Sequence, residues 1–218
     1  MVPYHLKIVC RFSAKLGLFA WLFLALNGCR MSDDTENQLP FFTSKDLSPQ
    51  WNIQPTQEVA AFSFVDQSGK TICSDSLRKG MYLANFFFTS CPGICPKMTN
   101  RLLSIQDSLL RLKGVTLLSF SVMPMVDSVA VLKEYEKKYG IHPEIWHLLT
   151  GDKTAIYRLG RSSFFADDNT QGDTSTFLHS DKLFLVDRNQ HIRGVYNATR
   201  DEDMQRVLAD VNQLKKEY

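Results

Sequence analysis

The feature that most limits the fold of this chain is an apolar run that passes directly into a cysteine pair. Residues 81–88 read MYLANFFF, a length and composition typical of a strand buried on both faces. Cys91 and Cys95 follow it. Apolar residues then recur at steps of three and four, as on one buried helix face ended by Gly114: Met98, Leu102, Ile105, Leu109 and Leu112. The sequence therefore predicts a strand–loop–helix unit with two cysteines at its junction.

Strand and helix patterns continue along the rest of the chain. Further strands are predicted at residues 59–65, 115–122, 146–149, 183–187 and 191–196. Helices are predicted at 129–139 with Asp127 as its cap, after Gly151, and in a last segment that buries Met204, Val207, Leu208, Val211 and Leu214. This order implies an α/β protein with a central mixed sheet flanked by helices, parallel in its core and antiparallel at its edge. With cysteines at the first strand–helix junction, we expect a thioredoxin-like fold.

The N-terminus has the pattern of a bacterial lipoprotein signal. Lys7, Arg11 and Lys15 precede the apolar run 16–26, which has the length of a secretory signal and is too short for a spanning helix. The run ends before Cys29, the expected site of lipid attachment. We therefore predict a signal peptide at 1–28, a flexible polar tether at 29–50 and one folded domain at 51–218. The domain would be held outside the cytoplasm in the cell envelope by a membrane lipid anchor; an ordinary cleaved signal and an uncleaved helix are the alternatives.

Charge and composition exclude other classes of protein. With 44% hydrophobic and 22% charged residues the chain is that of a folded protein. Removing the three basic residues of the signal changes the formal net charge from +2 to −1. No basic stripe suits nucleic acid, so no nucleic-acid partner is expected.

The chain has five cysteines, of which Cys10 lies in the signal and Cys73 is expected to be a buried free thiol. Cys91 and Cys95 are four residues apart at the start of a helix, so their sulfurs can converge on one point, and the helix dipole favours both thiolates. Such a pair can form a disulfide or bind a soft metal. A purely structural disulfide is disfavoured because the loop it would close is very small.

His179 is the expected third ligand. It lies in the segment Thr176–Ser180, directly before the strand at 183–187, and in thioredoxin folds that loop packs against the active-site cysteines. The same loop usually carries a cis-proline, yet no proline follows Glu144. Two thiolates and one imidazole suit Cu(I), hold Cu(II) with an added ligand, and accept Zn²⁺, so the spacing leaves the metal open. His142, His147 and His191 are expected to be solvated or hydrogen-bonded.

At these residues the chain resembles the Sco/SenC family of copper chaperones for cytochrome c oxidase. The resemblance rests on FFFTSCPGICP around Cys91 and Cys95, on WHLLTG at 146–151, and on LHS at 178–180 leading into LFLVD. It implies a thioredoxin fold and copper held by Cys91, Cys95 and His179. It also implies that the protein delivers copper to the oxidase CuA subunit, or another copper acceptor, or reduces that site's cysteines, with a thiol reductant as partner. The family usually has an acid where this chain has Met123.

Other functions remain open at this point. A membrane-anchored thiol–disulfide reductase would use Cys91 as nucleophile and Cys95 as resolving thiol, as a redox pair that forms a disulfide when oxidised. The chain lacks the Thr-x-x-Cys spacing of a thiol peroxidase. A role as a surface-binding lipoprotein would leave the cysteines and His179 unexplained. Should copper bind elsewhere, Met123 and Met125 are the candidates. We expect a metallochaperone rather than an enzyme.

Overall fold

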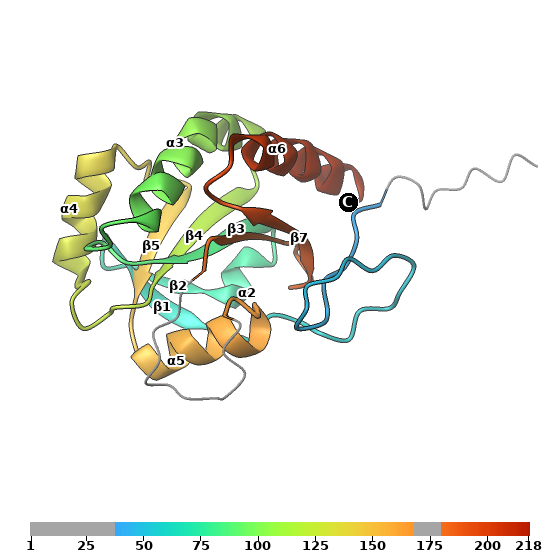
Figure 1. Ribbon diagram of the computed structural model, residues 1–218, viewed down its shortest axis with the longest axis horizontal. Coiled ribbons are helices and arrows are strands. Elements are labelled where there is room, and N and C mark those ends of the chain that lie inside the picture. Colours follow the sequence, from blue (N-terminus) through green and yellow to red (C-terminus); the bar gives the residue numbers. More distant parts are fainter. Residues whose placement is uncertain (1–37, 168–179) are drawn as a thin grey trace, which may run out of the picture. The chain divides into compact units, whose positions relative to one another are not determined.

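The computed structural model describes residues 38–167 and 180–218, which form a mixed sheet covered by helices on both faces (Figure 1). Its seven strands lie in the order β2-β1-β5-β4-β3-β6-β7. The strands are β1 (Ser63–Asp66), β2 (Thr71–Cys73), β3 (Met81–Phe87), β4 (Val115–Ser121), β5 (Trp146–Thr150), β6 (Lys182–Val186) and β7 (Ile192–Asn197). The helices are α2 (Ser74–Leu77), α3 (Ile94–Leu112), α4 (Val129–Tyr139), α5 (Lys153–Arg158), the π-helix η2 (Leu159–Ser163) and α6 (Asp201–Lys216).

The three central strands are parallel, and the strands on either side of them are antiparallel. β3 pairs with β4 from Met81↔Val115 to Phe87↔Ser121, and β4 pairs with β5 in the same direction. β6 and β7 form the hairpin that the sequence predicts, and β6 is antiparallel to β3. The predicted α/β fold with a mixed sheet is therefore confirmed. Because β3 and β4 are parallel neighbours, the β3–α3 and β4–α4 connections leave the same end of the sheet (Figure 1).

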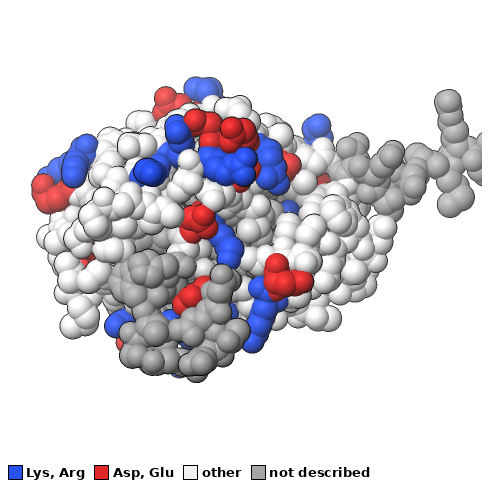
Figure 2. Space-filling view, viewed as in Figure 1, with Lys and Arg blue, Asp and Glu red and all other residues white. Residues whose placement is uncertain are grey.

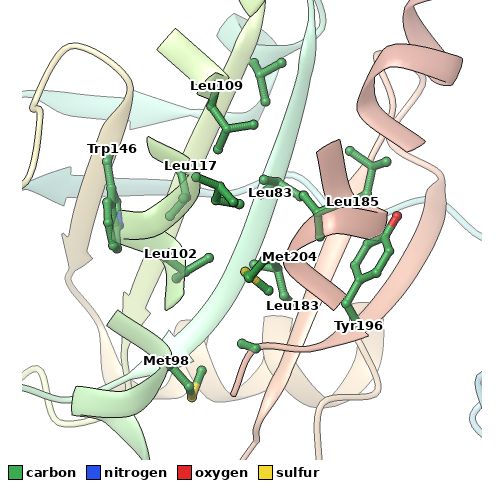
Figure 3. Packing of buried hydrophobic residues seen from close by; sticks show 14 of the residues in the cluster. Leu83, Met98, Leu102, Leu109, Leu117, Trp146, Leu183, Leu185, Tyr196 and Met204 are labelled. Atoms are coloured by element: carbon green, nitrogen blue, oxygen red, sulfur yellow. The ribbon is translucent and has the colours of Figure 1, made fainter. Parts of the chain in front are cut away.

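Alternate residues of the central strands face two separate hydrophobic clusters, as the pleat of a strand requires. Leu83 of β3 packs with Met98 and Leu102 of α3 and with Met204 of α6 (Figure 3). On the opposite face the cluster is rich in phenylalanine: Phe62, Phe64, Phe86, Phe120, Phe164 and Phe184. Burying the apolar residues of β3 on both faces fixes the strand that leads into Cys91.

Several local predictions differ from the structure. The strand expected at 59–65 begins only at Ser63, and α3 begins at Ile94, so that Cys95 lies in its first turn. Ser128, rather than Asp127, caps α4: its Oγ accepts the amide hydrogen of Val131 at 3.4 Å. Asp127 is turned inward instead, toward the segment that carries Cys91.

Arg193 of β7 binds the first described residues of the chain. Its side chain is only 4% exposed, donates to the carbonyls of Leu39 at 2.6 Å and Pro40 at 3.2 Å, and pairs with Glu217 at 2.8 Å. The amide of Phe42 donates to the carbonyl of Ile192, at the start of β7. Residues at the end of the expected tether therefore lie against the domain. Within the described ranges, none of the helices combines the length and apolar character that crossing a membrane requires.

Candidate metal centre

The two cysteines lie where β3 gives way to α3. Phe88 packs against both hydrophobic clusters, and the amide of Cys91 donates to the Phe88 carbonyl at 3.4 Å in the turn that follows. Pro96 is compatible with the first turn of α3 because its missing amide hydrogen would have no helical partner there. The sequence thus directs a tight turn between a buried strand and a helix, with Cys91 at the end of the turn and Cys95 in the first turn of the helix.

This turn brings the sulfur of Cys91 to the start of the helix. Cys91 Sγ accepts the amide hydrogen of Cys95 at 3.5 Å. Cys91 is half-buried and Cys95 is buried, and both are free thiols. The described residues contain no group of three His, Cys, Asp or Glu side chains able to hold a metal ion, and His179 lies outside them. Of the expected ligand set, the described residues thus include the two cysteines, which the contact of Cys91 Sγ with the Cys95 amide brings together.

The two thiols differ in their affinity for a proton. Partial burial acts to raise the pKa of Cys91, but hydrogen bonds from the amides of Cys95 and Gly93 stabilise its thiolate and hold the pKa below its ordinary value. Burial raises the pKa of Cys95 to about 12, and its hydrogen bond to Cys91 adds to this rise. The expectation that the helix start favours both thiolates thus holds for Cys91 and is wrong for Cys95, because burial outweighs the helix dipole.

Asp127 joins the cysteine segment to the end of β4. Its buried carboxylate accepts hydrogen bonds from the Thr89 amide at 3.1 Å, the Thr89 hydroxyl at 2.5 Å and the Ser121 hydroxyl at 2.6 Å. Its charge also acts to raise the pKa of Cys95, although less than burial does. The sequence predicted a capping role for this residue and missed its role in the site. Two sequence signals pointed to that role: its position just after the strand beside β3, and its match, with Pro124, to the loop of the family that the chain resembles.

The three histidines in the described part of the chain, and Cys73, have local partners. His147 Nδ1 lies 2.9 Å from Asp66, His191 Nδ1 lies 3.6 Å from Asp187, and His142 Nε2 lies 3.4 Å from Asp107. The prediction that these histidines are hydrogen-bonded or solvated is confirmed.

Cys73 is a free thiol at the end of β2, half-buried rather than buried, with its sulfur 3.4 Å from Ser63 Oγ. Cys10 and Cys29 lie outside the described residues.

Comparison with known proteins gives a consistent match. The model of the SCO1/SenC family matches residues 51–216. The SCO1 protein homolog of Bacillus subtilis is 30% identical over 156 residues, which cover 71% of this chain and 81% of the relative.

Solved structures resemble the fold over most of the domain. BsSco, a member of the Sco family of cytochrome c oxidase assembly proteins in which a disulfide switch was identified, has a TM-score of 0.64 and 30% identity, covering 73% of this chain and 94% of BsSco. A SCO1/SenC family lipoprotein from Bacillus anthracis has a TM-score of 0.64 and 26% identity, covering 73% of this chain and 95% of that protein. Copper-bound ScoI of Arabidopsis thaliana has a TM-score of 0.57 and 24% identity, covering 73% of this chain and 98% of ScoI, and is similar in fold.

Proposed function

The chain belongs to the SCO1/SenC family, and from this membership we propose that Cys91, Cys95 and His179 form a copper site. The protein would deliver this copper to the CuA site of a respiratory cytochrome c oxidase, or reduce the cysteines of that site. The observation that carries the proposal is the pair of free sulfurs at the start of α3, with Cys91 Sγ 3.5 Å from the Cys95 amide.

The donor chemistry of the site fits copper. Thiolate sulfur is a soft ligand that favours Cu(I), and an imidazole extends the set to Cu(II). The lowered pKa of Cys91 makes its thiolate easier to form than that of an ordinary cysteine. Cys95, with a pKa near 12, must lose its proton as copper binds, so binding releases a proton and strengthens with rising pH.

The sheet register supports His179 as the third ligand. β6 is antiparallel to β3, with Ala84↔Phe184 and Tyr82↔Val186 paired. The start of β6 therefore lies toward the end of β3, from which the cysteine segment leaves. Ser180, the described residue next to His179 in the chain, precedes β6 by two positions.

The role in oxidase assembly rests on the family. BsSco belongs to a family of cytochrome c oxidase assembly proteins, and the match to it covers nearly all of that chain. For this chain the oxidase CuA subunit is the proposed acceptor, and a thiol reductant must keep Cys91 and Cys95 reduced, because their disulfide cannot bind Cu(I).

The proposed location is the cell envelope, with Cys29 carrying the lipid. The short apolar run before Cys29 and the B. anthracis relative, itself a lipoprotein, support it. Cys29→Ser should move the protein from the membrane fraction to the soluble fraction or stall its processing. Equal membrane retention of the variant would favour an uncleaved anchor.

A thiol–disulfide reductase is the second candidate, and the unequal cysteines favour it. The Cys91 thiolate would attack a substrate disulfide, form a mixed disulfide and release one substrate thiolate. Cys95, after losing its proton, would then attack the Cys91 sulfur and release the second substrate thiol. The pair would end as a Cys91–Cys95 disulfide, having given two electrons to the substrate.

One variant separates the two functions. His179→Ala should lose much of the copper affinity, more for Cu(II) than for Cu(I), because two thiolates still hold Cu(I) weakly. In a reductase the same variant should keep most of its turnover of a model disulfide, since the sulfurs perform the exchange. Copper retention against a chelator and disulfide turnover are therefore measured on both proteins.

A second histidine gives the control. His142→Ala removes an imidazole that is 46% exposed and paired with Asp107, and it should leave copper retention unchanged. Unchanged copper binding in His179→Ala, together with strong reductase activity in the parent protein, would refute the copper assignment.

A further inference from the structure

The β4–α4 connection carries two further sulfur atoms beside the cysteine segment. Phe87 and Ser121 are paired at the ends of β3 and β4, and the amide of Val122 donates to the Phe87 carbonyl at 2.9 Å. Neighbouring strands are about 4.8 Å apart. Cys91 lies four residues beyond Phe87 and Met125 four residues beyond Ser121, so both segments begin side by side.

The two connections remain joined farther from the sheet. Asp127, two residues after Met125, accepts the amide hydrogen of Thr89, two residues before Cys91, at 3.1 Å. The charge of Asp127 also acts on Cys95. Met125 therefore lies in a segment fixed against the cysteine segment at both of its ends.

A tight turn exposes Met125. The amides of Val126 and Asp127 both donate to the Met123 carbonyl at 2.9 Å. These two bonds close a tight turn that contains Met125. Met125 is 89% exposed, so its side chain has almost no packing role. Met123 is half-buried against the phenylalanine-rich cluster, and both methionines border a hollow of about 130 Å³.

The two segments that carry these sulfurs contain no charged side chain, while Lys153, which borders the hollow, and Asp127, which acts on Cys95, are charged neighbours. Residues 88–96 and 121–126 contain no Asp, Glu, Lys or Arg, and Ile94 and Val126 are exposed apolar neighbours in the same segments. Figure 2 shows uncharged side chains below the charged surface of α4, over the part of the molecule from which both connections leave. Thioether sulfur is a neutral, soft ligand, and it favours Cu(I) over hard ions.

We propose that Met125 is a transit ligand for Cu(I), at which the ion enters and leaves the site formed by Cys91 and Cys95. This inference rests on the proposed copper function. During transfer a bond from Met125 Sδ to Cu(I) forms as a bond to one resident ligand breaks, and copper remains Cu(I) throughout. Met123, fixed by packing, lies at the edge of this path and gives the turn its shape.

The test uses the full domain, reduced and loaded with Cu(I). In Met125→Leu the rate of copper transfer to the chelator bathocuproine disulfonate should fall about tenfold, equal to about 1.4 kcal/mol in activation free energy. The equilibrium affinity should stay within about twofold of the parent protein, because the resident ligands are unchanged. The loss of a resident bond worth about 1.4 kcal/mol would instead lower the affinity tenfold. Leucine keeps the size and apolar surface of methionine and removes only the sulfur, and the high exposure of this position makes misfolding a poor explanation for any change.

A direct readout of the sulfur accompanies the kinetics. With ¹³C-methyl methionine and Ag(I) as a redox-inert stand-in for Cu(I), the methyl signal of Met125 should move as metal is added, while that of buried Met204 stays fixed. Val126→Ala, which trims the apolar surface and keeps the sulfur, should transfer copper at the parent rate.

The outcomes separate the two proposals. If the parent protein binds no Cu(I), the proposed function fails. If it binds Cu(I), but Met125→Leu transfers copper at the parent rate and the Met125 methyl signal of the parent protein does not move, the transit ligand is refuted. Slower transfer in Met125→Ser but not in Met125→Leu would show that apolar contact matters rather than sulfur, and would also refute it.

Discussion

Replacing Asp127 by alanine should loosen the cysteine segment and cost a large part of the stability of the domain. The carboxylate is fully buried and accepts three hydrogen bonds, two from Thr89 and one from Ser121. Because all three partners donate, the group acts as an acceptor only. Each bond to a charged group contributes about 1.5–3 kcal/mol net. The variant no longer buries a charge, which offsets part of the loss of these bonds. We therefore expect Asp127→Ala to lower the free energy of unfolding by about 3–5 kcal/mol.

Asp127→Asn provides a graded comparison. The amide oxygen can still accept from Thr89, and the amide nitrogen can donate to the Ser121 hydroxyl, whose hydrogen is free to rotate. We therefore expect Asp127→Asn to lower the free energy of unfolding by about 1–2 kcal/mol. Removing the negative charge also removes one of the influences that raise the pKa of Cys95, so this thiol should be alkylated at lower pH than in the parent protein.

The measurement is urea unfolding of the reduced, metal-free domain. Asp75→Ala, at a side chain that is 84% exposed, serves as the surface control, and it should change stability by less than about 0.5 kcal/mol. A loss below about 1 kcal/mol in Asp127→Ala, the size of a single ordinary hydrogen bond, would refute the view that this carboxylate holds the cysteine segment to β4.

Three further predictions follow from the same structure. Near neutral pH iodoacetamide should modify Cys91 much faster than Cys95: thiolate is available only above the pKa, which is lowered for Cys91 and near 12 for buried Cys95, and peptide mapping will test the order. Oxidation to the Cys91–Cys95 disulfide should abolish Cu(I) binding and reduction should restore it; stoichiometric binding by fully oxidised protein would place the metal elsewhere. Arg193→Met should cost about 3–5 kcal/mol by leaving Asp187 and Glu217 without their buried partner, and it should make the N-terminal segment more sensitive to limited proteolysis.

Local patterns predicted the central part of the fold well because they record burial directly. The steps of three and four in α3 identified Met98, Leu102, Ile105 and Leu109, which are buried, and Leu112, which is only partly buried near the end of the helix. The run before Cys91 identified β3, which is buried along its whole length. The strand β2, only three residues long, and the four-residue α2 were missed, since such short segments contain too few residues to show a period.

The site was harder to predict because its chemistry depends on contacts between distant parts of the chain. Asp127 and Ser128 are both good helix caps, and only the position of Thr89 beside β4 decides which of them turns inward. The sequence spacing places Cys91 and Cys95 together but contains no information on which sulfur is covered. The difference between their pKa values arises from burial under neighbouring elements, and therefore needed the structure.

The docking of the N-terminal segment on Arg193 has a consequence for orientation at a membrane. Phe42 joins the chain at Ile192, which pairs with Val186, which in turn pairs with Tyr82 at the start of β3. The point of attachment is thus at one end of β3, and the segment that carries Cys91 leaves from the other end, about 20 Å away along the strand. If Cys29 carries the lipid, the ten residue steps to Leu39 allow a stand-off of at most about 35 Å. The segment that carries Cys91 and Cys95 would then face away from the membrane, which favours an acceptor that projects its own site from the membrane over one lying flat on the bilayer.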